Sequence, residues 1–167
     1  MEISPLLPNH WPAVKTIYEQ GIATGHATFQ TSAPEWVEWD GAHLKHSRLV
    51  ALENGQVIGW AALTPVSGRC VYAGVAEISV YIAPDHRGMK IGETLLKALI
   101  TDSEQHGLWT LQAGIFPENA ASIKIHENCG FRQLGIREKI GRHNGIWRDT
   151  VLLERRSKTV GLTAPIP

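Results

Sequence analysis

One segment of the sequence combines a polar strand, a glycine-bearing turn and the start of a helix. Glu77 lies in a predicted strand of alternating polar and β-branched residues that ends at Ile82. Pro84 stops this strand because proline has no N–H for the sheet. The run Arg87–Gly92 then leads into an apolar stripe at helical spacing. Free N–H groups and the helix dipole favour negative charge at such a helix N-terminus, so the expected ligand carries a phosphate or pyrophosphate.

Two side chains are candidates for acid–base chemistry. Burial of Glu77 in its apolar strand would raise the pKa of the carboxyl group and make it a useful general base. The same pattern also fits a carboxylate at a strand edge that is exposed or paired with an arginine. His126 lies one helical turn after Ser122 on the same face. Its alternative reading is a buried histidine with a backbone partner.

Composition limits the classes of function. The chain has 167 residues and equal numbers of acidic and basic side chains, which gives no broad electrostatic footprint for nucleic acid or an anionic membrane. No apolar run is long enough to span a bilayer, and no signal peptide is evident. The two cysteines form no disulfide framework, so we expect a cytoplasmic protein. His43 and His46 have no third ligand in view, so we expect no metal.

The hydrophobic pattern predicts one domain over residues 1–155 and a loose C-terminal tail over 156–167. The expected strands are residues 2–6, 49–53, 56–63, 71–82, 108–115, 131–139 and 146–154. The expected helices begin at Asn9, as N-cap, and at Pro34, Gly88 and Pro117. They end near residues 21–25, 46, 106 and 128. This order predicts an α/β (α+β mixed) fold, a mixed sheet with helices on both faces.

These motifs together resemble one family. Arg87–Gly92 is similar to the pyrophosphate loop of the GNAT superfamily of N-acetyltransferases, although Lys90 stands where that loop usually has glycine. The rest of the chain, from about residue 17 to 153, resembles the phosphinothricin N-acetyltransferase-like subgroup. The matching segments are Thr28-Phe29, Arg69–Tyr72, Glu77–Ile82, Asn119–Ser122, Ile125–Phe131 and Gly145–Asp149. Lys90 must either adopt the backbone angle of a glycine or follow a different path, and its ammonium group can pair with a phosphate.

The resemblance implies a mostly antiparallel sheet of about seven strands, acetyl-CoA as co-substrate and a homodimer. It also assigns roles to residues. The catalytic candidates are Glu77 as base and His126 as acid or cofactor contact. The cofactor-binding candidates are Val80, Tyr81, Ile82, Arg87, Gly88, Met89, Lys90, Ile91, Gly92, Glu93, Asn119 and Ser122. The substrate-binding candidates are Thr28, Phe29, Arg69, Tyr72 and Trp147. Asn119 has the alternative reading of an ordinary N-cap, and each aromatic residue that of core packing.

The expected reaction is acetyl transfer to the α-amino group of a small amino acid or analogue. Phosphinothricin, methionine sulfoximine and methionine sulfone are all open as acceptors. Two alternatives remain: another amine, such as a polyamine, an aminoglycoside or a protein N-terminus, and a non-catalytic acyl-CoA sensor. Partners other than the small amine, its cofactor and a second copy of the chain are not expected.

Overall fold

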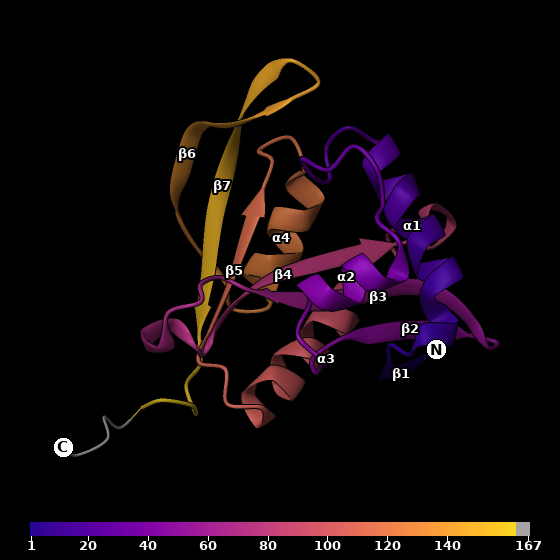
Figure 1. Cartoon of the computed structure of the whole chain (residues 1–167), viewed down its shortest axis with the longest axis horizontal. Helices are drawn as coiled ribbons and strands as arrows, with labels where there is room; N and C mark the ends of the chain where they lie inside the picture. The colour runs from indigo at the N-terminus through magenta and orange to yellow at the C-terminus, as the bar shows by residue number, and fades with distance from the viewer. Residues whose placement is uncertain (163–167) are drawn as a thin grey trace.

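The computed structural model describes residues 1–162 and forms one seven-stranded sheet in the order β1-β2-β3-β4-β5-β7-β6 (Figure 1). The strands are β1 (Glu2–Pro5), β2 (Leu49–Glu53), β3 (Gln56–Pro65), β4 (Val75–Ile82), β5 (Thr110–Ile115), β6 (Arg132–His143) and β7 (Ile146–Arg156). The α-helices are α1 (Trp11–Ala23), α2 (Trp36–Ala42), α3 (Ile91–Gln105) and α4 (Ala120–Asn128). The mixed, mostly antiparallel sheet of about seven strands is confirmed.

The pairing of β4 with β5 is the feature that creates the site. All other neighbours in the sheet are antiparallel, whereas β4 and β5 are parallel and pair only through Val75–Glu77 and Thr110–Gln112. Beyond these residues the two strands diverge (Figure 1). The outer half of β4 is therefore paired with β3 alone, and the main-chain groups on its other edge face an opening in the sheet.

Helices cover both faces of the sheet, as predicted. On one face, the leucines of α3 pack with Ala61, Ile78 and Leu111, and partly buried isoleucines of α4 join them. On the other face, the tryptophans of α1 and α2 pack with Trp60 and Ala62. Ala61 and Ala62 are neighbours on β3 and belong to opposite cores, as the two-residue period of a strand requires. The two cores hold β4 between them and fix the direction of its side chains.

The expected strand over residues 71–82 is wrong in its first part. Cys70–Tyr72 forms a 3-10 helix, and β4 begins only at Val75. Gly74 explains the break, because a side chain there would collide with the indole ring of Trp109. The main chain of Gly74 also accepts hydrogen bonds from the N–H groups of Trp109 and Thr110 at 2.9 and 3.1 Å.

All four helix starts differ from the prediction, and the fourth helix begins at Ala120 rather than at Pro117. Asn9 is not the N-cap of the first helix; it lies in a 3-10 turn, and His10 precedes α1. The second helix begins at Trp36 rather than near Pro34, and it ends at Ala42 rather than near residue 46. The third begins at Ile91 rather than Gly88.

The last two strands form a longer hairpin than expected. The predicted strand end at residue 139 is wrong, because β6 continues to His143 and the turn is Asn144-Gly145, both with positive φ. A bulge interrupts the pairing, since Arg137 pairs with Thr150 and Gly141 with Arg148. Three residues of β6 therefore lie opposite one residue of β7, and Lys139 has a φ of 46°.

The beginning of the expected tail is held against the domain. The Arg156 guanidinium donates hydrogen bonds to the carbonyl groups of Trp109, Ser157, Val160 and Gly161 at 2.8–3.3 Å. Residues 163–167 of the expected tail lie outside the described residues. Within residues 1–162, none of the helices combines the length and the hydrophobicity needed to cross a membrane.

Candidate active site

A cavity of about 820 Å³ lies where β4 and β5 separate. Its lining includes β4 from Glu77 to Tyr81, β5 from Ala113 to Ile115, and residues 27–30 after α1. This volume is typical of a small-molecule site. The cavity brings together several predicted site residues from distant parts of the sequence: Thr28, Phe29, Glu77, Val80, Tyr81, Asn119, Ser122 and His126.

Glu77 lines this cavity with a half-buried carboxyl group. Burial raises the pKa of the Glu77 carboxyl, and the positive charge of Arg137 acts in the opposite direction. A Cβ atom added to Gly114 would lie 3.6 Å from Glu77 Oε1, so the carboxyl group extends over β5. Within the described chain the carboxyl makes no hydrogen bond. A free carboxylate with a raised pKa is suited to accept a proton.

Arg137 is a cavity residue that the sequence did not indicate. It lies on β6 at the edge of the bulge, opposite Thr150, and both residues line the cavity. Ile140, three residues later, lines it as well. In a regular strand, residues 137 and 140 would point to opposite faces of the sheet. The bulge between them allows both residues to line the cavity. Asp149 stabilises the bulge by accepting a hydrogen bond from the Lys139 N–H at 2.7 Å.

His126 is buried, with 4% of its surface exposed, and lines the cavity from α4. Its Nδ1–H donates to the Ser122 carbonyl at 2.7 Å, because a carbonyl can only accept. Burial lowers the pKa of His126, so the neutral ring is favoured and Nε2 carries a lone pair. Nε2 is buried and has no partner in the described structure. This atom is therefore an available hydrogen-bond acceptor in the cavity wall.

The segment from Arg87 to Glu93 forms the N-terminus of α3. Gly88 and Lys90 have φ angles of 78° and 61°, and Lys90 is the N-cap. Lys90 thus adopts the left-handed conformation that glycine usually supplies. Within residues 1–162, the N–H groups of residues 88–93 donate to no protein acceptor. Such a row of free amides at a helix N-terminus can bind a phosphate or pyrophosphate.

Arg148 fixes the loop that covers the cavity after α1. Its guanidinium donates to the Gly25 carbonyl at 2.9 Å, pairs with Glu118 at 3.2 Å, and lies 3.9 Å from the centre of the Phe116 ring. The loop residue Phe29 packs edge-on against Phe116, with ring centres 4.8 Å apart. No sequence pattern indicated that this arginine holds the loop that carries Phe29.

Asn119 is the N-cap of α4, which is the alternative interpretation of this residue from the sequence. Its Oδ1 accepts a hydrogen bond from the Ser122 N–H at 3.3 Å, at the start of α4. Its Nδ2 donates to the His26 carbonyl at 3.3 Å. The same side chain lines the cavity, so capping does not exclude contact with a ligand.

Three predicted substrate-binding residues lie elsewhere in the single chain. Arg69 and Tyr72 are exposed and do not line the cavity; the Arg69 guanidinium lies 5.7 Å from the centre of the Tyr72 ring. Trp147 is 56% exposed on the β6–β7 hairpin and stacks with Arg142 instead. The remaining predicted cofactor residues, Ile82 and the loop 87–93, lie outside the cavity lining.

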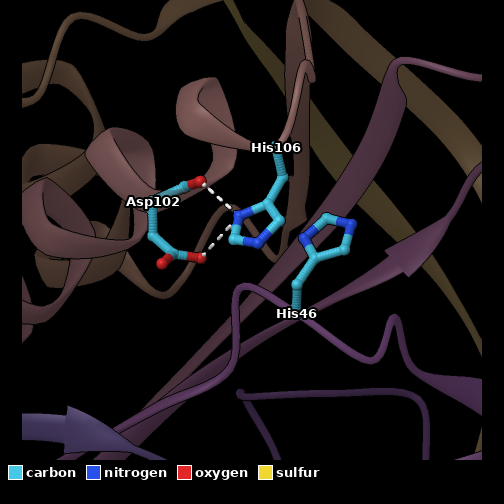
Figure 2. A group of neighbouring side chains, drawn as sticks. All are labelled: His46, Asp102 and His106. Carbon is cyan, nitrogen blue, oxygen red and sulfur yellow. Dashed lines mark hydrogen bonds and ion pairs between the residues drawn. The ribbon is translucent and has the colours of Figure 1, made fainter.

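A separate cluster contains the side chains best placed to hold a metal ion in the described chain. His46, Asp102 and His106 have ligand atoms within 4.8 Å of one another (Figure 2). The two imidazole rings are stacked, with centres 4.2 Å apart and planes inclined by 6°. A metal binds in the plane of an imidazole ring, and two stacked, nearly parallel planes offer no shared position. His43 is not part of this cluster; it stacks on Trp39. The geometry is not that of a preformed metal site.

Comparison with known proteins identifies relatives of the chain. Residues 12–131 match the model of the acetyltransferase (GNAT) family. Phosphinothricin N-acetyltransferase of Alcaligenes faecalis is 36% identical over 160 residues, covering 92% of this chain and 81% of the relative. L-Methionine sulfoximine/L-methionine sulfone acetyltransferase of Salmonella typhimurium is 34% identical over 106 residues, covering 64% of this chain and 62% of the relative.

Solved structures give the same fold. A phosphinothricin acetyltransferase from Sinorhizobium meliloti in complex with acetyl-CoA aligns with a TM-score of 0.88 and 26% identity, over 99% of this chain and 92% of that one. Ribosomal-protein-alanine N-acetyltransferase from Brucella melitensis aligns with a TM-score of 0.85 and 30% identity, over 94% of this chain and all of that one (100%).

Proposed function

The chain belongs to the acetyltransferase (GNAT) family and is an acetyl-CoA-dependent N-acetyltransferase; from this premise we propose that its acceptor is the α-amino group of a small amino acid or amino-acid analogue. The observation that carries this proposal is the half-buried Glu77 in a cavity where β4 and β5 separate. The names of two relatives, which act on phosphinothricin and on methionine sulfoximine or sulfone, support the acceptor class.

The residues present fit acetyl-CoA. The free amides of residues 88–93 suit its pyrophosphate, and the Lys90 ammonium adds a positive charge beside them. The unpaired edge of β4, over Val80–Ile82, offers main-chain groups to the pantetheine arm. Asn119 and Ser122 lie on the α4 side of the same opening. The cofactor supplies a thioester whose acetyl carbon accepts the amine.

Glu77 takes the proton that the attacking amine releases, directly or through a water molecule. Its raised pKa brings it closer to neutral pH, where a general base is most effective. Main-chain N–H groups of the Val80–Ile82 segment polarise the thioester carbonyl as negative charge develops on its oxygen.

His126 contributes a hydrogen-bond acceptor rather than a proton at neutral pH. Its Nδ1–H is used by Ser122, and its free Nε2 carries a lone pair. Donating a proton to the leaving thiolate would require a protonated ring, which burial disfavours. We therefore assign His126 to binding a hydrogen-bond donor of the cofactor or the substrate.

A thiol-release screen with acetyl-CoA tests the proposal. The panel contains α-amino acids, L-methionine sulfone, L-methionine sulfoximine, phosphinothricin, a polyamine, an aminoglycoside and an alanine-terminated peptide. We expect the highest kcat/KM for the amino acids and analogues. The alanine peptide represents the second candidate, since one structural neighbour is a ribosomal-protein-alanine acetyltransferase. Coenzyme A binding without thiol release from any amine would favour a sensor.

The β6–β7 hairpin supports a homodimer. Its apolar side chains are 43–65% exposed: Leu134, Ile136, Ile140, Ile146 and Trp147. An exposed apolar surface on an edge hairpin is a typical interface between copies. Light scattering should give the mass of a dimer for the wild type and of a monomer for Ile136→Glu. A wild-type monomer at the same concentration would contradict the dimer.

The two cysteines support a cytoplasmic setting. Cys70 is exposed, Cys129 is buried, and both are free. Exposed thiols persist in reducing compartments. Export of the native chain to an oxidising compartment would contradict this part of the proposal.

A further inference from the structure

The cavity contains one positively charged side chain placed to bind an anion. Of the lysines and arginines in residues 1–162, Arg137 alone lines it. The acidic side chains in the lining are Glu35, Glu38 and Glu77. Glu35 forms an ion pair at 2.6 Å with Lys15, and Lys15 is not part of the cavity lining. An occupant of this cavity therefore meets acidic groups and one cation, and the amino group and the carboxylate of an amino acid complement these charges.

Arg137 has no partner in the described structure. It makes no ion pair and no hydrogen bond, in contrast to Arg132, which pairs with Glu154 at 3.1 Å, and Arg148, which pairs with Glu118 at 3.2 Å. A guanidinium group has five N–H donors in a planar arrangement that matches a carboxylate. Arg137 directly precedes the bulge that Asp149 holds, it lines the cavity, and its charge acts on the Glu77 carboxyl in the same cavity.

We infer that Arg137 is the specificity-determining residue that binds the α-carboxylate of the acceptor, in the role that the sequence assigned to Arg69. The inference rests on the proposed function, because it concerns the same cavity and the same amine. The α-amino group then lies toward Glu77 on β4 and the carboxylate toward Arg137 on β6. Arg69 stacks on Tyr72 and does not line the cavity of its own chain.

Paired substrates isolate the carboxylate contact. We compare L-methionine sulfone with its α-carboxamide, which keeps the amine and the side chain but carries no charge. The wild type should prefer the acid. Arg137→Met should lower kcat/KM for the acid about 10- to 100-fold, the range of a lost hydrogen bond to a charged group, mainly through a higher KM. Measured at a pH above the acid limb of the kcat/KM profile, where Glu77 is ionised in both proteins, its kcat/KM for the carboxamide should stay near the wild-type value.

Two arginine variants are the comparison. Arg132→Met removes a charge from the same strand outside the cavity and should leave both substrates unaffected. Arg69→Met tests the sequence-based assignment. Loss of the preference for the acid in Arg69→Met but not in Arg137→Met would overturn the inference. An equal loss on acid and carboxamide in Arg137→Met would also overturn it, because Arg137 would then bind another group.

The outcomes separate this inference from the proposed function. Thiol release with methionine sulfone, together with an unchanged acid preference in Arg137→Met, refutes the role of Arg137 and leaves the acetyltransferase proposal standing. Absence of thiol release from every α-amino acid and analogue in the wild type refutes both. Thermal unfolding of each variant checks that it is folded, and the exposed position of Arg137 predicts wild-type stability.

Discussion

Glu77 on β4 and Arg137 on β6 line the same cavity, and the charge of Arg137 acts on the Glu77 carboxyl. Burial raises the pKa of the Glu77 carboxyl, and the Arg137 charge lowers it. The pair thus balances two needs of a general base: a proton affinity that burial increases, and an ionised state that a nearby cation preserves.

The first prediction concerns Glu77 itself. Glu77→Gln keeps the shape of the side chain but removes its ability to accept a proton, so kcat/KM should fall by about 10²- to 10⁴-fold. The Kd of acetyl-CoA, measured by calorimetry, should stay near the wild-type value because the amides of residues 88–93 are unchanged. Glu138→Gln, on the exposed side of β6, is the matched control. Equal losses of turnover and cofactor affinity would mean that Glu77 is structural.

The second prediction concerns pH. Arg137→Gln removes a positive charge that lowers the pKa of Glu77, so that pKa should rise. The base is active only when ionised, and the acid limb of the kcat/KM profile should therefore move to higher pH. The other titratable groups of the cavity are unchanged: Glu35, Glu38, His43, His126, Tyr18 and Tyr81. A profile measured with the carboxamide substrate avoids the loss of carboxylate binding. An acid limb at the wild-type position, or at lower pH, would contradict the coupling.

Much of the sheet followed from local sequence, and the exceptions have physical causes. Asn54-Gly55 predicted the β2–β3 hairpin, which the structure has. Val71 and Tyr72 are residue types that favour the predicted strand, but they belong to a 3-10 helix, and the close approach of Trp109 to Gly74 breaks the segment before β4. That contact joins residues distant in sequence, and no local pattern reports it.

The site was predictable where a motif lies on one continuous segment. Glu77, His126 and the residues 28–29 were found in this way, and the cavity brings them together. Arg137 was missed because its inward direction depends on a bulge that forms between two strands. Arg69 was chosen from its motif alone, and its position on the surface depends on the 3-10 turn that follows it.

The third prediction concerns the contact that breaks the expected strand. Gly74→Ala places a methyl group against the Trp109 ring, so overpacking should lower the free energy of unfolding by about 1–3 kcal/mol. Gly68→Ala, where an added Cβ meets no atom within 4 Å, is the matched control and should stay near wild type. Urea denaturation measures both. Equal stabilities of the two variants would show that the Trp109 contact does not hold this segment.

The fourth prediction concerns two histidines, the buried His126 and the half-buried His43. Burial lowers the pKa of His43 and of His126 in the folded protein, whereas in the unfolded chain both titrate near the ordinary value of about 6.5. Below that pH the unfolded state binds more protons, so the free energy of unfolding should fall as pH decreases. Each histidine contributes at most about 1.4 kcal/mol per pH unit.

The matched comparison for the histidines is His126→Asn, which removes one of the two titrating groups. Its free energy of unfolding, measured by urea denaturation between neutral and mildly acidic pH, should fall less steeply than that of the wild type. A slope identical to that of the wild type would mean that His126 titrates alike in both states.

A crystal structure with coenzyme A and L-methionine sulfone tests the central claim most directly, because that claim joins the cofactor loop to the base. We expect the diphosphate oxygens within about 3 Å of main-chain N–H groups of residues 88–93, a normal N–H···O distance. We also expect the thiol in the opening between β4 and β5, with the substrate amine directed toward Glu77. A diphosphate bound elsewhere, or an amine on the far side of the cavity from Glu77, would contradict the account.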